Sequence, residues 1–250
     1  DSYINLDNLD VQENSFGLFL KGTSGWLSNS TIDVKCNAID TNSHKETGAI
    51  SHTLNVENNI ITTEEGAGIT AYDDAIVVAR DNVISGAGES SGFGIRSSTV
   101  EIHNNVIGPI GGWNGLWIYG TSDVIAENNT IQDTAKEAVL IGEYHFNDQG
   151  WNVPTPTAAR LYLANNQISN NTGTCNSQMY DGDFACPAIH VFMSSATLYD
   201  NTVVNNGGDG IRIKGGIVNA QRNTIEVGAF AANISMYDDN YGTKYGSIAY

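Results

Sequence analysis

Apolar and polar residues alternate in short runs along most of this chain, and the runs recur at regular intervals. Runs of three to five residues with a period of two predict short β-strands. Many of them begin with a small residue followed by an aliphatic one. These pairs are Gly17-Leu18, Ala49-Ile50, Gly68-Ile69, Gly94-Ile95, Gly115-Leu116, Ala138-Val139, Ala188-Ile189 and Gly210-Ile211. No segment combines a 3.6-residue period with capping residues, which disfavours a solenoid of helices.

A second pattern is an asparagine followed two residues later by Ile or Val. The asparagines are Asn37, Asn59, Asn82, Asn105, Asn129, Asn166, Asn201 and Asn223, with spacings of 22, 23, 23, 24, 37, 35 and 22 residues. A period of about 20–50 residues is typical of stacked repeats. Asn tolerates the left-handed backbone of a sharp bend, and its amide both donates and accepts hydrogen bonds. We therefore expect the asparagine side chains to stack and to bond to one another.

Twenty-two residues accommodate three short strands and three turns, but not a strand, a helix and their loops. The expected fold is all-β, a right-handed parallel β-helix of about ten turns of 22–24 residues each. Such a rod would be about 45–50 Å long at one strand spacing per turn. Stacked Ile, Val and Leu residues would fill its interior, each repeat packing only against its neighbours.

These two patterns resemble the parallel β-helix repeat family over about residues 17–235. The resemblance implies the fold of extracellular and cell-surface β-helix proteins, pectate lyases and polygalacturonases, and this fold supports many activities. Arg212-Ile213-Lys214 resembles the Arg-Ile-Lys element of polygalacturonases. The sequence has no Gly-His-Gly element, and Asp73-Asp74 lies about five turns away, roughly 24 Å along the rod. The full catalytic motifs of these enzymes are therefore missing.

The repeat runs without a linker, which predicts one domain over residues 1–250. Solenoid ends expose a layer of unpaired strands that natural proteins cover with a cap. Neither end of this sequence resembles an amphipathic capping helix, and residue 1 is Asp. We therefore expect an excerpt of a longer chain, or a chain that associates with itself end to end or laterally.

The net charge is −17, from 11 basic and 28 acidic residues. Binding to nucleic acid needs a basic surface, so nucleic acid is not an expected partner. No apolar run reaches the 18 or more residues that suggest a membrane span.

Cys175 and Cys186 bracket a polar segment that the repeat does not need, which predicts a disulfide and hence an extracellular or cell-surface location. Cys36 is expected to be packed or free. Four sequons permit glycosylation. Their asparagines are Asn29, Asn128, Asn170 and Asn233.

Two segments lengthen the repeat, at about residues 142–157 and 171–187. The first follows a Gly-led strand and the second precedes the next one. Both are therefore expected to flank the same sheet and to form walls around a groove. Long excursions from a regular scaffold are usually functional or disordered.

Aromatic and cationic residues occupy the outward positions of the Gly-led strands. The candidate ligand-binding residues are Arg96, Trp117, Tyr119, His190, Phe192, Arg212 and Lys214. Aromatic faces stack on sugar rings and cations pair with carboxylate groups, so this sheet could bind a polysaccharide. The alternative is an ordinary exposed sheet with solvated charges.

Catalysis would need further groups. β-Elimination on a uronic acid polymer needs a base near the C5 proton and a cation on the carboxylate. Candidates for the base are His190, His145, Tyr144 and Lys214, with Arg212 as the cation. Hydrolysis instead needs two carboxylates facing one sugar bond. Candidates for these are Glu143, Asp181, Asp183 and Asp209.

No metal-ligand motif is present, so no cofactor is expected, with calcium at Asp73-Asp74 or Asp238-Asp239-Asn240 as the open alternative. The leading hypothesis is an extracellular spacer module that presents a face to a polysaccharide or a cell-surface protein. The alternatives are a lyase or hydrolase acting on an acidic polysaccharide, and a phage tail or adhesin shaft.

Overall fold

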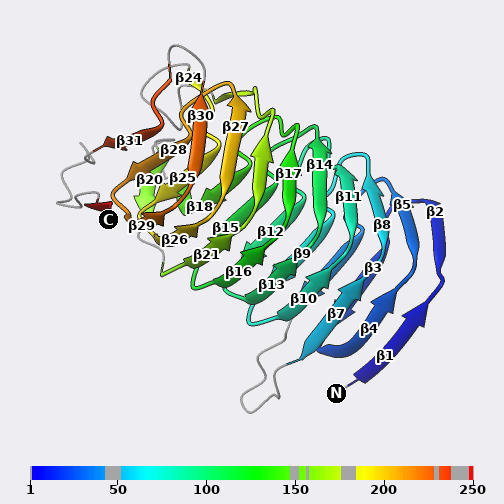
Figure 1. Cartoon of the computed structure of the whole chain (residues 1–250). Helices are drawn as coiled ribbons and strands as arrows, with labels where there is room; N and C mark the ends of the chain where they lie inside the picture. The colour runs from blue at the N-terminus through cyan, green and yellow to red at the C-terminus, as the bar shows by residue number, and fades with distance from the viewer. Residues whose placement is uncertain are drawn as a thin grey trace.

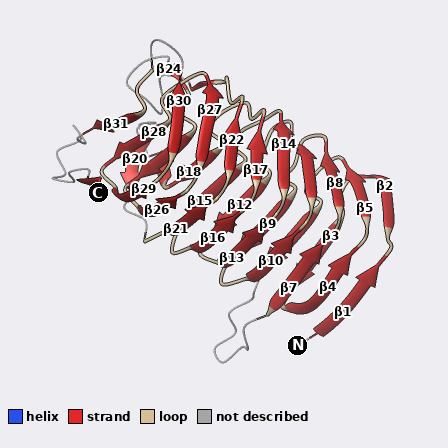
Figure 2. Ribbon diagram, viewed as in Figure 1, coloured by secondary structure: helices blue, strands red, loops and turns tan. Residues whose placement is uncertain are grey.

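The computed structural model describes residues 2–42, 52–146, 152–155, 158–175, 184–227, 231–237 and 248–249. All regular elements in these ranges are strands, which follow one another as the turns of a coil (Figure 1; Figure 2). Strands from successive turns pair in parallel and form three long sheets.

The first sheet contains ten strands: β1 (Ser2–Asp7), β4 (Thr23–Ser28), β7 (Thr53–Glu57), β10 (Ile76–Arg80), β13 (Thr99–His103), β16 (Asp123–Glu127), β21 (Arg160–Ala164), β26 (Ser195–Tyr199), β29 (Ile217–Gln221) and β32 (Ile248–Ala249). The second contains nine: β2 (Asp10–Asn14), β5 (Thr31–Val34), β8 (Ile60–Thr63), β11 (Val83–Gly86), β14 (Val106–Ile110), β17 (Thr130–Gln132), β22 (Gln167–Ser169), β27 (Thr202–Asn206) and β30 (Thr224–Val227). The third also contains nine: β3 (Leu18–Lys21), β6 (Ile39–Asn42), β9 (Ile69–Tyr72), β12 (Phe93–Arg96), β15 (Leu116–Tyr119), β18 (Val139–Ile141), β25 (Ile189–Phe192), β28 (Ile211–Lys214) and β31 (Ile234–Tyr237).

This arrangement is a right-handed parallel β-helix, which confirms the fold expected from the repeat. The two chain ends lie at opposite ends of the stack (Figure 1). Each turn contributes one strand to each sheet, so residues that share a register position form a column running along the rod.

The core consists of such columns of aliphatic side chains. The second residue of each second-sheet strand points inward, and from β5 to β22 this residue is a fully buried Ile. Val203 continues the column in β27 and is also fully buried. Burying one such side chain contributes roughly 2 kcal/mol, and stacking identical residues lets each pack on the next.

The asparagine ladder lies at the bend between the first and second sheets. In the series from Asn59 to Asn223, the backbone N–H of each ladder asparagine donates to the Oδ1 atom of the ladder asparagine one turn later, at 2.8–3.0 Å. The side-chain amide also donates to the next Oδ1, at 2.9–3.1 Å. Asn59 to Asn201 are almost fully buried, so the ladder satisfies backbone groups that water cannot reach.

The left-handed backbone at this bend belongs to the residue before each ladder position, not to the ladder asparagine as expected. That residue has φ between 51° and 57° in every turn from Asn29 onward. The residues are Asn29, Asn58, Asp81, Asn104, Asn128, Asn165, Asp200 and Arg222. The left-handed backbone and the stacked amide, which the sequence analysis assigned to one asparagine, therefore belong to two adjacent residues.

Asn37 is not part of the ladder, which corrects the first member of the series. Ser30 takes the ladder position in that turn, and its backbone N–H donates to Asn59 Oδ1 at 2.9 Å. Asn37 instead precedes third-sheet strand β6, where its Oδ1 accepts the backbone N–H of Ala67 at 2.9 Å. The Asn-x-Ile pattern at residue 37 therefore marks a different bend.

The same turn corrects a second prediction. Ile39 pairs with Leu18 and Ile69 in the third sheet, so β6 takes the place that was assigned to a strand at Ala49-Ile50. Those two residues lie outside the described ranges. In β12, Phe93 and not Ile95 aligns with Ile69 and Leu116, because the pair Gly92-Phe93 leads that strand.

The two predicted insertions contain antiparallel hairpins. β19 (Glu143–Phe146) pairs with β20 (Asn152–Thr155) between β18 and β21. β23 (Thr174–Cys175) pairs with β24 (Phe184–Ala185) between β22 and β25. The first hairpin thus leaves the end of a third-sheet strand, and the second precedes the start of the next one.

Among the described residues, no helix has the length and apolar character to cross a membrane.

Candidate functional site: the outer face of the third sheet

Two columns of residues occupy the outward positions of the third sheet. The first contains Asp40, Thr70, Gly94, Trp117, Leu140, His190, Arg212 and Ser235. The second contains Asn42, Tyr72, Arg96, Tyr119, Phe192 and Lys214. All seven predicted ligand-binding residues lie in these columns. Arg96 belongs to the second and not the first, because of the shifted register of β12.

Aromatic rings gather on β15 and the loop before it. The rings of Trp117 and Tyr119 stack with centroids 4.7 Å apart and an interplanar angle of 28°. Trp113, which was not predicted, lies 5.1 Å from Trp117 at 57°, and the Lys136 ammonium lies 4.7 Å from the Trp113 ring centroid. Trp113 and Trp117 are both half-buried, so part of this aromatic surface is open to solvent.

Tyr72 and Arg96 extend the aromatic surface toward the N-terminal end. Burial raises the pKa of Tyr72, and its hydrogen bond with Tyr119 opposes the rise. The Tyr72 hydroxyl lies over β12, where a Cβ on Gly94 would come within 3.2 Å of it. The Arg96 guanidinium lies 4.9 Å from the Tyr72 ring centroid and pairs with Asp73 at 2.9 and 3.0 Å. We call Tyr72, Arg96, Trp113, Trp117 and Tyr119 the aromatic face.

A polar column precedes the third-sheet strands, and all of the members named here except the half-buried Asn37 are buried. Its members stand two residues before the first paired residue of each strand, and they include Asn37, Ser91, Asn114, Glu137 and Asp209. Of these, Asp209 was predicted from the sequence as a candidate carboxylate, and Asn37 was assigned to the asparagine ladder. The others were missed because their column follows no strand period and changes residue type from turn to turn.

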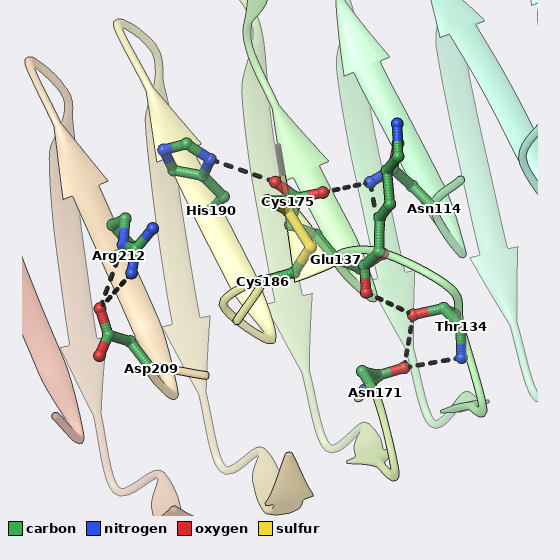
Figure 3. Close-up of a disulfide and its surroundings, with 10 residues drawn as sticks. Asn114, Thr134, Glu137, Asn171, Cys175, Cys186, His190, Asp209 and Arg212 are labelled. Carbon is green, nitrogen blue, oxygen red and sulfur yellow. Dashed lines mark hydrogen bonds and ion pairs between the residues drawn. A yellow bond between two sulfur atoms is a disulfide. The ribbon is translucent and has the colours of Figure 1, made fainter. Parts of the chain in front are cut away.

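Glu137 and His190 form a buried pair within this region (Figure 3). Glu137 is 1% exposed and His190 is 0% exposed. His190 Nδ1 lies 3.4 Å from Glu137 Oε1, and Asn114 Nδ2 donates to Glu137 Oε2 at 2.8 Å. Burial lowers the pKa of His190 more than the bond to Glu137 raises it, and Arg212 and Lys214 lower it further. His190 is therefore a neutral imidazole oriented through Nδ1.

Arg212 and Lys214 also point outward but are only 8% and 9% exposed. The Arg212 Nε and Nη2 atoms donate to Asp209 Oδ2 at 3.1 and 2.9 Å. Burial raises the pKa of Asp209, but hydrogen bonds from Ser235 and Ala232 and the Arg212 charge together lower it below its usual value. Phe192 is fully buried beside them. The structure thus brings His190, Arg212 and Lys214 together, at positions with little access to solvent.

The remaining candidate residues are less informative. Tyr144, His145 and Glu143 lie on β19, whose backbone alone is described, and Asp181 and Asp183 lie outside the described residues, as do Asp238, Asp239 and Asn240. Third-sheet order places five strand steps between β9, which Asp73 follows, and β28, which carries Arg212. This agrees with the separation of about five turns counted from the sequence, which is too large for Asp73 or Asp74 to act on a sugar bond beside Arg212.

The predicted disulfide between Cys175 and Cys186 is present, and Cys36 is a free, half-buried thiol. All four sequon asparagines are exposed. Asn29, Asn128 and Asn170 also have positive φ. At Asn29 and Asn128 the sequon arises because the exposed bend residue, the ladder residue and a Thr follow one another.

The outer face of the first sheet carries a feature that the sequence analysis did not predict. A shallow groove of about 460 Å³ crosses β13, β16, β21, β26 and β29. Its lining includes Glu101, Asp123, Ile125, Arg160, Tyr162 and Ile217. Arg160 pairs with Asp123 inside it.

Comparisons with known proteins agree with the fold. A family model described as a right-handed beta helix region matches residues 1–147. The structure is similar to the Azotobacter vinelandii mannuronan C-5 epimerase AlgE4 A-module, with a TM-score of 0.53 and 15% identity over 99% of this chain and 74% of that one. The AlgE6 A-module of the same organism gives a TM-score of 0.49 and 14% identity over 100% of this chain, which spans 65% of that module. No protein of curated function matches the sequence.

Proposed function

The chain belongs to the right-handed β-helix family, and from this premise we propose that it binds an acidic polysaccharide along the outer face of the third sheet. The observation that carries the proposal is the aromatic face, where Trp117 and Tyr119 stack beside Arg96. Trp113 and Trp117 are half-buried and Tyr119 is buried beside Trp117, so the two tryptophan rings offer the surface on which a sugar can stack, and a guanidinium pairs with a uronate carboxylate in two parallel bonds.

The distribution of positive charge supports an acidic ligand. The described ranges contain nine Lys and Arg residues, and five of them lie on third-sheet strands or just before one. These are Lys21, Arg96, Lys136, Arg212 and Lys214. Lys21 and Arg96 are exposed and Lys136 is half-buried, so in a chain with net charge −17 this face still offers cations to a polyanion.

The shape of the sheet also suits a polymer. Tyr72 on β9 and Trp117 on β15 are separated by two strand steps, or about 10 Å. A rigid rod with one binding sheet would suit a spacer that holds a glycan. We place this role outside the cytosol. The disulfide supports that location. The AlgE4 A-module, named as a mannuronan C-5 epimerase, places a uronate polymer among the first ligands to test.

Isothermal titration with mannuronan, polygalacturonate and a neutral glucan tests the proposal. We expect binding of a uronate polymer that weakens with added salt, and about a tenfold loss, or 1.4 kcal/mol, in Arg96→Ala and in Trp117→Ala. Trp26→Ala and Arg160→Ala are matched controls, because both side chains lie on the outer face of the first sheet. Equal binding by all four folded variants would refute this site.

A second candidate function is acid–base chemistry at a uronate carbon. The specific observation is the neutral His190 held by Glu137, with Arg212 and Lys214 beside it. A neutral imidazole can take a proton at Nε2 when its Nδ1–H is held by a carboxylate. Because His190 is 0% exposed, neighbouring groups would have to move before a polymer could reach its Nε2 atom.

Deuterium uptake at the sugar C5 position, with ultraviolet absorbance of unsaturated products, tests this second function. An enzyme would incorporate deuterium from heavy water or release unsaturated ends, and His190→Asn would abolish both. Binding without deuterium uptake or product leaves the spacer as the function.

A further inference from the structure

The disulfide of the second hairpin lies against the buried Glu137–His190 pair (Figure 3). We propose that, when the two cysteines are reduced, Cys175, Cys186, Glu137 and His190 bind one Zn²⁺ ion. Every chain of this sequence passes through the dithiol state before its disulfide closes. The inference concerns that state and does not depend on polysaccharide binding.

The donor atoms are already close together. One oxygen of Glu137 and the sulfur atoms of Cys175 and Cys186 all lie within 4.8 Å of one another. In a tetrahedral zinc site with bonds of about 2.0–2.3 Å, ligand atoms are separated by roughly 3.3–3.8 Å. Reduction breaks the sulfur–sulfur bond and lets the two sulfur atoms separate toward that distance.

His190 is the proposed fourth ligand, although it lies outside the group of three residues whose donor atoms are within 4.8 Å of one another, so its ring has to move toward the sulfur atoms when the ion binds. Its Nδ1 atom lies 3.4 Å from Glu137 Oε1, which is about the separation of a nitrogen and an oxygen bound to one tetrahedral zinc ion. Two thiolates, an imidazole and a carboxylate form a donor set that zinc prefers over calcium or magnesium.

The surroundings orient the carboxylate. Asn114 Nδ2 donates to Glu137 Oε2 at 2.8 Å, which fixes the carboxylate while Oε1 faces His190. Such partners of a ligand typically change metal affinity by about 10–100-fold. All four proposed ligands are at most 1% exposed, so bulk water competes weakly for the ion.

The backbone holds the two cysteines near each other independently of the sulfur–sulfur bond. Cys175 pairs with Phe184 in the β23–β24 hairpin, and the backbone N–H of Cys186 donates to Gly173 O at 3.0 Å. The Cα atoms of the two cysteines are 5.0 Å apart. The spacing of 11 residues is unlike a zinc-knuckle motif, which explains why no zinc site was predicted from the sequence.

A water-soluble phosphine reduces the disulfide: it takes an oxygen atom from water and gives up two electrons, and the cysteines gain two electrons and two protons. Each thiol then releases its proton to solvent as its sulfur binds zinc. Metal binding therefore releases two protons and leaves the oxidation state of the ion unchanged.

The experiment uses the full chain carrying Cys36→Ser, so that only the two hairpin thiols remain. After reduction under argon, Co²⁺ is titrated in as a spectroscopic probe and then displaced by Zn²⁺. We expect one equivalent of Co²⁺, with thiolate-to-cobalt charge-transfer and tetrahedral d–d absorption bands that disappear when zinc is added. The oxidised protein should show neither band.

Variants assign the ligands. Glu137→Gln and His190→Asn should each weaken Co²⁺ binding at least tenfold, and Cys175→Ser with Cys186→Ser should abolish the bands. Glu101→Gln, on the outer face of β13, is the matched control and should bind as the parent does. Equal affinity in Glu137→Gln and the parent would mean binding by the two thiols alone and would overturn the proposed site.

X-ray absorption at the zinc edge of the reduced Cys36→Ser protein covers the case in which Glu137→Gln or His190→Asn fails to fold. We expect two sulfur ligands at about 2.3 Å and two nitrogen or oxygen ligands at about 2.0–2.1 Å. Four light-atom ligands, or less than half an equivalent of zinc after dialysis, would also overturn the proposal.

Discussion

Removing one rung of the asparagine ladder should cost far more than removing its neighbour. In Asn105→Ala, the backbone N–H and the side-chain amide of Asn82 both lose the Oδ1 acceptor, which lies 2.9 Å from each. Each buried donor left without a partner costs about 1–3 kcal/mol, so we expect a loss of about 4 kcal/mol. This is a large share of the roughly 5–15 kcal/mol that stabilises a typical protein.

The matched control is Asn104→Gly, one residue earlier. Asn104 is exposed and has φ of 57°, a conformation that glycine adopts without strain. We expect a change within about 0.5 kcal/mol. Asn223→Ala should have an intermediate effect of about 2 kcal/mol, because Asn223 is half-buried and water can replace part of what is lost.

Urea unfolding gives the overall stability, and hydrogen exchange at the Asn82 amide gives the local effect. A solenoid is stabilised by nearest-neighbour contacts, so exchange should accelerate at Asn82 before it does so in distant turns. If Asn105→Ala cost less than about 1 kcal/mol, or no more than Asn104→Gly, the ladder would not be what holds the bend.

Three further outcomes follow from substitutions at single positions. Burial lowers the pKa of His190 from 6.5, so the unfolded chain binds a proton that the folded chain does not, and stability should fall as the pH drops below 6.5. Urea midpoints measured as the pH is lowered should show a smaller fall in stability for His190→Asn than for His103→Asn. Among the described residues, no hydrogen-bond partner reaches the buried Ser91 Oγ. Ser91→Ala should therefore raise stability by about 1 kcal/mol, and a lower melting temperature would contradict this. Gly86 has φ of 92° and a Cβ there would lie 1.9 Å from Thr63 O, so Gly86→Ala should lower the melting temperature by several degrees, and an unchanged value would argue against the described backbone.

The repeat determined the fold because its period reports directly on a stacked structure. Inward Ile residues two positions after each ladder asparagine appear where the pattern placed them, at Ile84, Ile107 and Ile131. The disulfide could also be predicted, since Cys175 and Cys186 flank a segment outside the repeat.

The errors came from bends that look alike in sequence. Asn37 has the local pattern of a ladder residue but precedes a third-sheet strand, and Ser30 replaces Asn at the true position. A hydroxyl and an amide can end the same ladder, so residue type alone could not decide the register.

The candidate site was only partly predictable. The outward columns gave Trp117, Tyr119 and Arg96, because alternation in a strand fixes which side chains share a face. Glu137 and Asn114 lie in a turn, where no period applies, and their contact with His190 depends on the stacking of different turns.

The hydrogen bonds of the ladder keep the same length whatever the number of residues in a turn. Chain segments of 22 to 37 residues join successive asparagines from Asn59 to Asn223, yet the backbone-to-amide bond stays at 2.8–3.0 Å throughout. Both hairpins begin away from this bend, beside the third sheet. New loops grafted at those two points should therefore leave the scaffold intact, and lineages of this protein are free to exchange their surface chemistry there.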